Sequence, residues 1–384
     1  MKNSILLLMT PNMSLKKWND RGHLSRELSF YQDLCKRGDL NLIIFSYGRN
    51  DQSFVKDIPE FKVLEMFNWI PKKLPFKVQN VIYHFFALIL YRKYFQTVLI
   101  AKTNQFRASR FGLLLKLFYR IPLVIRMGFY HSHFKKLSAF GRLEEKFAFR
   151  NTDLIQTTSF EAGSFIEKFY GVNKKKILSM CNAIDLERFK PMETQKEFDV
   201  IFVGRLEKVK NIKLLIDAVN TEKLKTLIIG IGAHDEYVKQ AMANNPNIVW
   251  HERVNNHDLP LYYNKSRCFI LLSNYEGNPK VLLEAMACGL PSVVTKVPGI
   301  RECITDNVNG LFVDENPEGV KKALLEIVTN EDKANAFGNN ALEWVKNQSD
   351  LQKNIDKELN FYFDYLKISH RLPQYELQPD SFQS

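Results

Sequence analysis

The stretch that decides the fold is residues 198–218, Phe198-Asp-Val-Ile-Phe-Val-Gly-Arg-Leu-Glu-Lys-Val-Lys-Asn-Ile-Lys-Leu-Leu-Ile-Asp-Ala218. Its first six residues predict a buried strand, and the apolar spacing after residue 210 predicts a helix. Ligands of parallel sheets bind beyond the carboxyl ends of the strands, so we expect Gly204, Arg205 and Lys210 at a ligand site. Two fixed cations suit a diphosphate. The alternative is that both are solvated loop cations.

The same alternation of strands and helices extends in both directions through the 384 residues. In the second half, helical patterns of about 10–15 residues separate the predicted strands. These strands are Thr226–Ile229, Asn247–Trp250, Cys268–Leu272, Ser292–Thr295 and Leu311–Val313. In the first half, the predicted strands are Ile5–Met9, Leu42–Phe45, Val98–Ala101, Leu123–Ile125 and Leu154–Thr157, with helices at 24–37 and 110–119.

This pattern predicts an α/β protein with two Rossmann-like domains, whose parallel sheets face a central cleft. We expect the first domain at residues 1–190 and the second at 191–350, with a candidate linker at residues 182–197. Residues 351–372 are expected to form a helical segment that packs back towards the first domain. Residues 373–384 are expected to be a poorly ordered tail.

Charge is distributed unevenly along the chain. Residues 1–190 carry 32 Lys and Arg against 15 Asp and Glu, whereas residues 191–384 carry 22 against 27. Residues 66–143 contain no acidic residue but 14 Lys and Arg and 17 aromatic residues. We interpret this region as a surface for an anionic partner, either a membrane with acidic lipids or a phospholipid-linked substrate, and consider nucleic acid unlikely. The alternative is a set of solvated helix faces.

Cysteine usage and hydropathy indicate the compartment. The five cysteines are scattered and none lies in a C-x-x-C pair, so neither a disulfide framework nor a zinc site is indicated, and a reducing compartment fits best. The apolar run at residues 5–9 is too short for a signal peptide core. Residues 78–91 are too short and too polar for a membrane span.

A second informative segment is residues 273–291, Ser273-Asn-Tyr-Glu-Gly-Asn-Pro-Lys-Val-Leu-Leu-Glu-Ala-Met-Ala-Cys-Gly-Leu-Pro291. Pro279 is well placed as the first residue of a helix. Glu276 then lies in the preceding turn, and Glu284 lies about a turn and a half into the helix. The amides after Gly277 can cradle a phosphate, and carboxylates suit a ribose diol and sugar hydroxyls. The alternative is that Glu276 caps the helix and Glu284 is solvated.

This segment is similar to the E-x7-E signature of retaining GT-B glycosyltransferases of family 4, the glycosyl transferases group 1 family. Three further elements of that family occur in the same order. They are the G-R-x4-K element (Gly204, Arg205, Lys210), the N-G-V-D-x3-F-x-P linker (Asn182, Asp185, Phe189, Pro191) and the G-x-x-E…G-x-L-V element (Gly299, Glu302, Gly310, Val313).

The resemblance implies a GT-B fold, transfer of a sugar with retention, and no essential metal. It implies a nucleotide-sugar co-substrate, with a UDP-sugar favoured, and no other cofactor. Arg205 and Lys210 would hold the donor diphosphate and stabilise the leaving group. Glu284 would bind the donor ribose, and Glu276 would contact the transferred sugar. Further donor contacts are implied for Gly204, Gly230, Arg253, Val254, Gly277, Asn278, Pro279, Lys280 and Val281.

The first half departs from the family pattern at two places. The glycine-rich loop of the family is reduced to Asp20-Arg-Gly22-His, so Gly22 is the glycine that could approach a phosphate. Gly128 occupies the position at which the family often has a histidine. His131 or His133 could substitute only by a shift, and the alternative is a surface histidine.

The resemblance therefore predicts a glycosyltransferase that moves a sugar from a nucleotide-diphosphate sugar to a glycan or lipid-linked acceptor in bacterial-type polysaccharide or glycolipid synthesis. We expect it in the cytoplasm, associated peripherally with the inner face of the membrane through residues 66–143. Two alternatives remain open. One is a non-catalytic nucleotide-sugar-binding homologue, and the other is a GT-B nucleotide-sugar epimerase, which the paired glutamates and cations disfavour.

Overall fold

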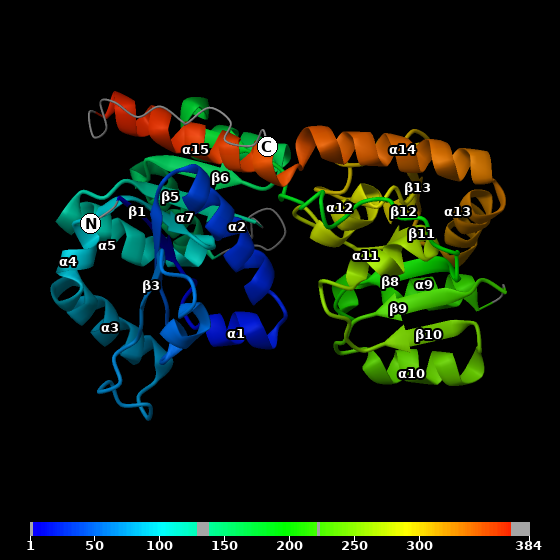
Figure 1. The fold of residues 1–384 in the computed structure, drawn as a ribbon, viewed down its shortest axis with the longest axis horizontal. Helices are drawn as coiled ribbons and strands as arrows, with labels where there is room; N and C mark the ends of the chain where they lie inside the picture. The colour runs from blue at the N-terminus through cyan, green and yellow to red at the C-terminus, as the bar shows by residue number, and fades with distance from the viewer. Residues whose placement is uncertain (1–2, 129–137, 221–222, 370–384) are drawn as a thin grey trace. The chain divides into compact units, whose positions relative to one another are not determined.

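The computed structural model describes residues 3–128, 138–220 and 223–369, which form two compact units (Figure 1). The first unit contains the chain up to Thr157, Ala162–Ser179, and the chain from Ile355 onward. The second unit contains Thr158–Glu161 and Met180–Asn354. The division therefore falls at Met180, before the boundary expected between residues 190 and 191. Its physical reason is that Ile184 and Phe189 are buried in the hydrophobic core of the second unit.

The first unit is built on a seven-stranded parallel sheet with the strand order β3-β2-β1-β4-β5-β6-β7. All five residues of β1 are buried, as expected for a parallel strand covered on both faces. The strands are β1 (Ser4–Leu8), β2 (Asn41–Phe45), β3 (Phe61–Leu64), β4 (Val98–Thr103), β5 (Leu123–Met127), β6 (Leu154–Thr157) and β7 (Ile177–Ser179).

Amphipathic helices connect these strands, and polar side chains cap several of them. Ser14 accepts a hydrogen bond from the amide of Lys17 at the start of α1, and Ser138 accepts one from Gly141 at the start of α7. The helices are α1 (Leu15–Asp20), α2 (Leu24–Arg37), α3 (Phe76–Leu90), α4 (Arg92–Phe95), α5 (Ser109–Tyr119), α7 (Ala139–Asn151) and α8 (Phe160–Tyr170), with 3-10 turns η1 (Asp51–Val55), η2 (Phe106–Ala108) and η3 (Lys174–Lys176).

The last described helix, α15 (Leu351–Ile368), belongs to the first unit from residue 355 onward. A fully buried ion pair joins it to β4, since Lys102 Nζ lies 2.5 Å from Glu358 Oε1. Gln156 of β6 donates a second hydrogen bond to Glu358, at 2.7 Å. Burial opposes ionisation of Glu358, but the Lys102 ammonium and the hydrogen bonds hold its pKa below the ordinary value. This cluster fixes α15 to strands far away in the sequence.

The second unit has a six-stranded parallel sheet in the order β10-β9-β8-β11-β12-β13. This is the order of a doubly wound Rossmann sheet, in which the winding direction reverses between the first and fourth strands. Here the reversal lies between β8 and β11. The strands are β8 (Phe198–Val203), β9 (Thr226–Ile229), β10 (Ile248–His251), β11 (Ser266–Leu271), β12 (Ser292–Thr295) and β13 (Leu311–Val313).

Helices with buried apolar faces complete the core of the second unit. In α12, six consecutive residues from Leu282 to Ala287 are buried, so this short helix is enclosed by its surroundings. The helices are α9 (Ile212–Val219), α10 (Asp235–Asn244), α11 (Leu259–Asn264), α12 (Lys280–Ala287), α13 (Pro317–Thr329) and α14 (Glu331–Gln348), with the 3-10 turn η4 (Lys208–Lys210). No helix within the described residues is long and apolar enough to cross a membrane.

Candidate active site

The predicted site residues of the second unit follow the two strands at which the sheet changes direction. The loop after β8 carries Gly204, Arg205 and Lys210, and the loop after β11 carries Glu276. The strand order explains why residues so far apart in sequence meet, because β8 and β11 are hydrogen-bonded neighbours. The carboxyl ends of strands at such a switch point are where ligands bind in α/β sheets.

Backbone contacts hold the loop after β8 in place. The amide of Gly204 donates to Ile229 O at 3.0 Å, and Val209 O accepts from the amide of Asn274 in the neighbouring loop at 2.9 Å. Lys210 ends η4, and Asn211 follows it with a left-handed φ of 50° before α9 begins. A backbone hydrogen bond therefore joins the two loops one residue before Lys210 and two residues before Glu276.

Lys210 and Glu276 form an ion pair between Nζ and Oε1, with side-chain exposures of 13% and 14%. Ser273 Oγ donates to the same carboxylate oxygen at 2.7 Å, and Thr295 Oγ1 fixes the Ser273 carbonyl at 2.6 Å. Among the described residues, none donates to Glu276 Oε2, and Lys210 Nζ has no second acceptor. The pair is thus oriented by the protein but retains hydrogen-bonding capacity for a ligand.

Arg205 is exposed, and its guanidinium makes no hydrogen bond or ion pair within residues 3–128, 138–220 and 223–369. Its five donors are consequently available to an anion that approaches this loop. Together with Lys210, it places two basic side chains in the loop after β8.

Glycines allow the backbone segments of the site to approach closely. A Cβ on Gly299, which has φ +79°, would lie 2.2 Å from Gly277 O and 2.7 Å from Glu276 O. A Cβ on Gly230, which has φ +140°, would lie 1.9 Å from Gly204 O. The sequence indicates Gly299 only as part of a family element. In the structure, its lack of a Cβ lets its backbone pack against the turn that carries Glu276 and so support that turn.

Asn278 is almost completely buried, and its side chain is used inside the protein. Its Oδ1 accepts from the amide of Asn182 at 2.7 Å, its carbonyl accepts from Asn182 Nδ2 at 2.7 Å, and its Nδ2 donates to Cys303 Sγ at 3.5 Å. These bonds tie the predicted linker element to the turn after β11. The side chain of Asn278 therefore positions the turn.

Glu284 lies in α12 with only 1% of its surface exposed. Its Oε2 accepts a hydrogen bond from Tyr263 OH at 3.3 Å, and the same hydroxyl lies 3.3 Å from Val281 O. The alternative of a solvated Glu284 is therefore wrong. A cap role for Glu276 is also wrong, because α12 begins at Lys280 after Pro279 and has no side-chain cap. Tyr263 is a partner that the sequence did not indicate.

The remaining predicted positions lie in different environments. Arg253 is exposed, and Val254 is partly buried against the core of the second unit. In the first unit, Gly22 has φ +69° in an exposed turn after α1, with no atom within 4 Å of the position its Cβ would take. His131 and His133 lie outside the described residues.

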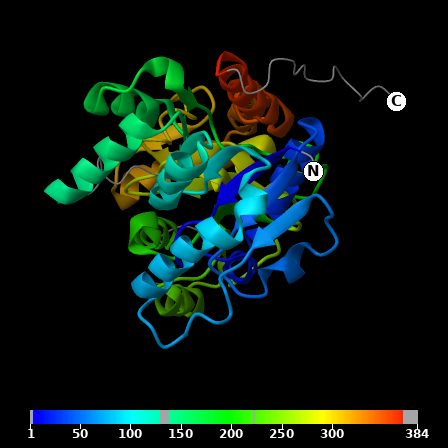
Figure 2. The same ribbon diagram turned by 90° about the vertical axis from the view of Figure 1, so that its left-hand side faces the viewer.

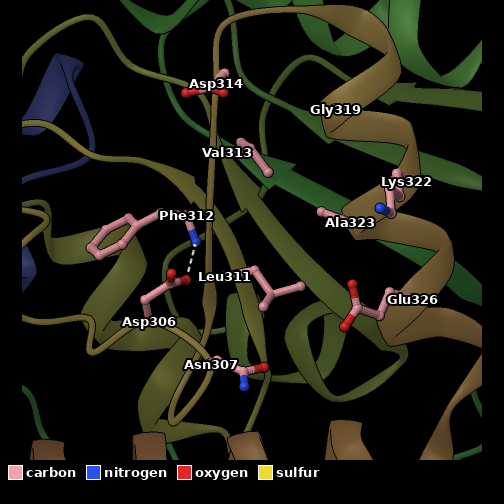
Figure 3. Close-up of a pocket in the computed structure, with 10 residues that line it drawn as sticks. All are labelled: Asp306, Asn307, Leu311, Phe312, Val313, Asp314, Gly319, Lys322, Ala323 and Glu326. Atoms are coloured by element: carbon pink, nitrogen blue, oxygen red, sulfur yellow. Dashed lines mark hydrogen bonds between the residues drawn. The ribbon is translucent and has the colours of Figure 1, made fainter.

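A separate cavity of about 380 Å³ lies in the second unit between β13 and α13 (Figure 3). Asp306 faces β13 there and accepts a hydrogen bond from the Phe312 amide at 2.9 Å, while Lys322 and Glu326 extend from α13. Its lining residues include none of the positions predicted to bind the donor.

Comparison with known proteins identifies the second unit. Residues 183–344 match the family model for Glycosyl transferases group 1, so this part of the chain carries that domain. An uncharacterized glycosyltransferase of Methanocaldococcus jannaschii is 27% identical over 240 residues, which cover 61% of this chain and 66% of that protein. An O-antigen biosynthesis glycosyltransferase of Escherichia coli is 27% identical over 186 residues, which cover 48% of this chain and 53% of that protein. The matches therefore span less than two thirds of these relatives.

Solved structures confirm the predicted fold class over nearly the whole chain. Sucrose-phosphate synthase from Thermosynechococcus elongatus superposes with a TM-score of 0.76 at 16% identity, covering 96% of this chain and 100% of that chain. Anabaena HepE, solved in complex with UDP and glucose, superposes with a TM-score of 0.70 at 17% identity, covering 94% and 100%. The chain thus has two Rossmann-like α/β domains, and its structural neighbours are GT-B glycosyltransferases.

Proposed function

We propose, from the Glycosyl transferases group 1 domain at residues 183–344, that this protein is a retaining glycosyltransferase that uses a nucleotide-diphosphate sugar. The observation that carries the proposal is the oriented pair of Lys210 and Glu276 at the switch point of the second sheet, with the unpaired Arg205 in the same loop as Lys210. Cations and a carboxylate at one place suit a ligand that carries both a diphosphate and a hydroxylated sugar.

In the proposed reaction, the bond between the anomeric carbon and the diphosphate oxygen breaks, and a bond from the acceptor oxygen to the same carbon forms on the same face. Arg205 and Lys210 stabilise the charge that develops on the departing nucleoside diphosphate. Glu276 holds sugar hydroxyls through its second oxygen. The leaving phosphate takes the acceptor proton, and we assign neither a protein base nor a metal.

Glu284 is proposed to bind the donor ribose, as the family resemblance implies. Its burial beside Tyr263 adds a condition to this role, because the carboxylate must become accessible when the donor binds. A change of the Tyr263 contact upon donor binding would provide that access.

A UDP-sugar is the donor we favour, since the HepE structure contains UDP and glucose. The acceptor we propose is a glycan or lipid-linked sugar, because an O-antigen biosynthesis enzyme is among the relatives. We propose that it is presented at the inner face of a membrane, with residues 66–143 of the first unit meeting the anionic surface.

The test is donor turnover in Lys210→Met, with Lys208→Met as the matched control. Lys208 is an exposed lysine of the same 3-10 turn, and its side chain has no partner among the described residues. Removing one preorganised donor to a developing negative charge lowers kcat by about 100- to 1000-fold. We expect this loss for Lys210→Met and wild-type turnover for Lys208→Met, measured as UDP released from a panel of UDP-sugars.

The products distinguish the alternatives. A glycosylated acceptor with the anomeric configuration of the donor supports the proposal. Donor binding without turnover would indicate a non-catalytic homologue, and a UDP-sugar with an inverted ring carbon would indicate an epimerase. Equal turnover in both lysine variants would refute the role of Lys210.

A further inference from the structure

Helix α3 of the first unit exposes an unusually apolar face. Its buried side is fixed by Tyr83, whose ring stacks on Phe45 at 4.5 Å and whose hydroxyl donates to Leu64 O at 2.8 Å. Its outward side carries exposed large apolar residues, which are Val78, Val81, Phe85, Phe86, Ile89 and Leu90. Figure 2 faces this unit and shows α3 as a light-blue helix in the foreground. A contiguous apolar surface of this kind marks an interaction site.

Trp69 extends this face beyond the helix. Trp69 is 54% exposed, and its indole packs edge-on against Phe86 at 4.8 Å and stacks on Phe67 at 5.5 Å. Trp at the margin of an apolar surface is typical of side chains placed at the level of lipid headgroups.

Exposed cations lie at both ends of the helix, and none forms an ion pair within the described residues. They are Lys72, Lys73 and Lys77 on one side and Arg92 and Lys93 on the other. No acidic residue occurs between Glu65 and Glu144. The five cations that border the apolar face are therefore available to an anionic partner.

We infer that α3 and Trp69 insert into the interface of an anionic bilayer, with the apolar face among the acyl chains and the five cations at the lipid phosphates. An apolar helix face with a basic border is the composition of interfacial membrane helices. A second copy of the chain fits less well, because a two-fold interface across α3 would bring these cations against their own counterparts. The inference makes specific the membrane surface of the proposed function and does not depend on the donor site.

The experiment uses the full chain and sedimentation with vesicles of phosphatidylcholine alone or mixed with phosphatidylglycerol. We expect binding to the mixed vesicles only. Phe85→Ser combined with Ile89→Ser should weaken binding at least about tenfold, and Lys72→Gln combined with Lys73→Gln by on the order of 25-fold. The matched control is Met242→Ser combined with Val308→Ser, which changes exposed apolar residues of the second unit and should leave binding unchanged.

A second readout locates the insertion. Brominated phosphatidylglycerol should quench the wild-type tryptophan fluorescence, and Trp69→Phe should abolish that quenching while vesicle binding persists. Equal binding to neutral vesicles, no binding at all, or quenching that survives in Trp69→Phe would overturn the inference. The inference would also be overturned if sedimentation velocity showed a dimer that the double variant Phe85→Ser, Ile89→Ser dissociates without any change in its lipid binding.

UDP-sugar hydrolysis without vesicles separates this inference from the proposed function. If the wild-type protein hydrolyses a UDP-sugar but does not bind vesicles, only the proposed membrane insertion is refuted. Vesicle binding by a protein that hydrolyses no donor would refute only the glycosyltransferase proposal. The α3 variants should retain wild-type hydrolysis, which also shows that they are folded.

Discussion

Replacement of Gly299 by Ala tests whether the turn that carries Glu276 must keep its position. The new Cβ would lie 2.2 Å from Gly277 O, whereas Cβ contacts below 3.0 Å essentially do not occur, so the turn has to withdraw. The left-handed φ of +79° and the overpacking together destabilise the second unit by about 2 to 5 kcal/mol. A displacement of this size near reacting atoms lowers catalysis by roughly 100-fold.

The assay is kcat/KM for the proposed sugar transfer, with urea unfolding of the same variant measured in parallel. Gly310→Ala is the matched control, because its Cβ would lie 2.7 Å from Ser292 O, away from the turn and without a positive φ. It should lose stability by about 1 to 3 kcal/mol and keep wild-type kcat/KM per folded molecule. The reasoning would be refuted by a Gly299→Ala enzyme with wild-type kcat/KM, since the geometry of the turn would then be unnecessary.

Three further predictions concern buried polar groups. Glu358→Ala should destabilise the first unit by about 3 to 5 kcal/mol in urea unfolding, because the Lys102 ammonium stays buried without its partner. Adding Lys102→Met should restore most of this stability, and a double variant as unstable as Glu358→Ala would contradict the pairing. Burial lowers the pKa of His84 to about 4 from 6.5, so the free energy of unfolding should fall as the pH falls from 6.5 towards 4. His84→Gln should reduce this loss of stability, and an unchanged pH profile of stability in the variant would contradict the prediction. Tyr263→Phe should change KM for the donor more than kcat if its hydroxyl controls access to Glu284, and equal effects on both would oppose that role.

The strands of the second unit were predictable because each contains a short, mainly apolar run, including β10 and β13, which lie at the edges of the sheet and are only partly buried. The structure shifts their bounds by two residues or fewer, as for β11, predicted at Cys268–Leu272 and found at Ser266–Leu271. Two strands of the first sheet, β3 and β7, were not predicted. Both lie at the edges of the sheet, β3 includes the exposed Lys62, and all three residues of β7 are only partly buried. Neither β3 nor β7 has the continuous buried apolar run that identifies a central parallel strand.

The candidate site was predictable in its residue types but not in its contacts. The sequence predicts Arg205, Lys210 and Glu276 as site residues because each lies shortly after a strand. The ion pair between Lys210 and Glu276 was not predictable, because it joins residues 66 apart and depends on the order of strands in the sheet. The burial of Glu284 depends on α11, whose Tyr263 covers it. The role of Gly299 depends on a close approach of two backbones, which no single-sequence pattern reveals.

The ion pair between Lys102 and Glu358 has a consequence for how the chain is made. The two residues are 256 positions apart, and ribosomes add about 5 to 20 residues per second. The nascent first unit consequently holds Lys102 without its carboxylate for roughly 10 to 50 seconds, during which residues 180–354 of the second unit are synthesised. The unit that begins first is therefore the one that is completed last. A fragment that stops before residue 355 would leave the first unit in that unfinished state, whereas a circular permutant that joins α15 to β1 would make it continuous.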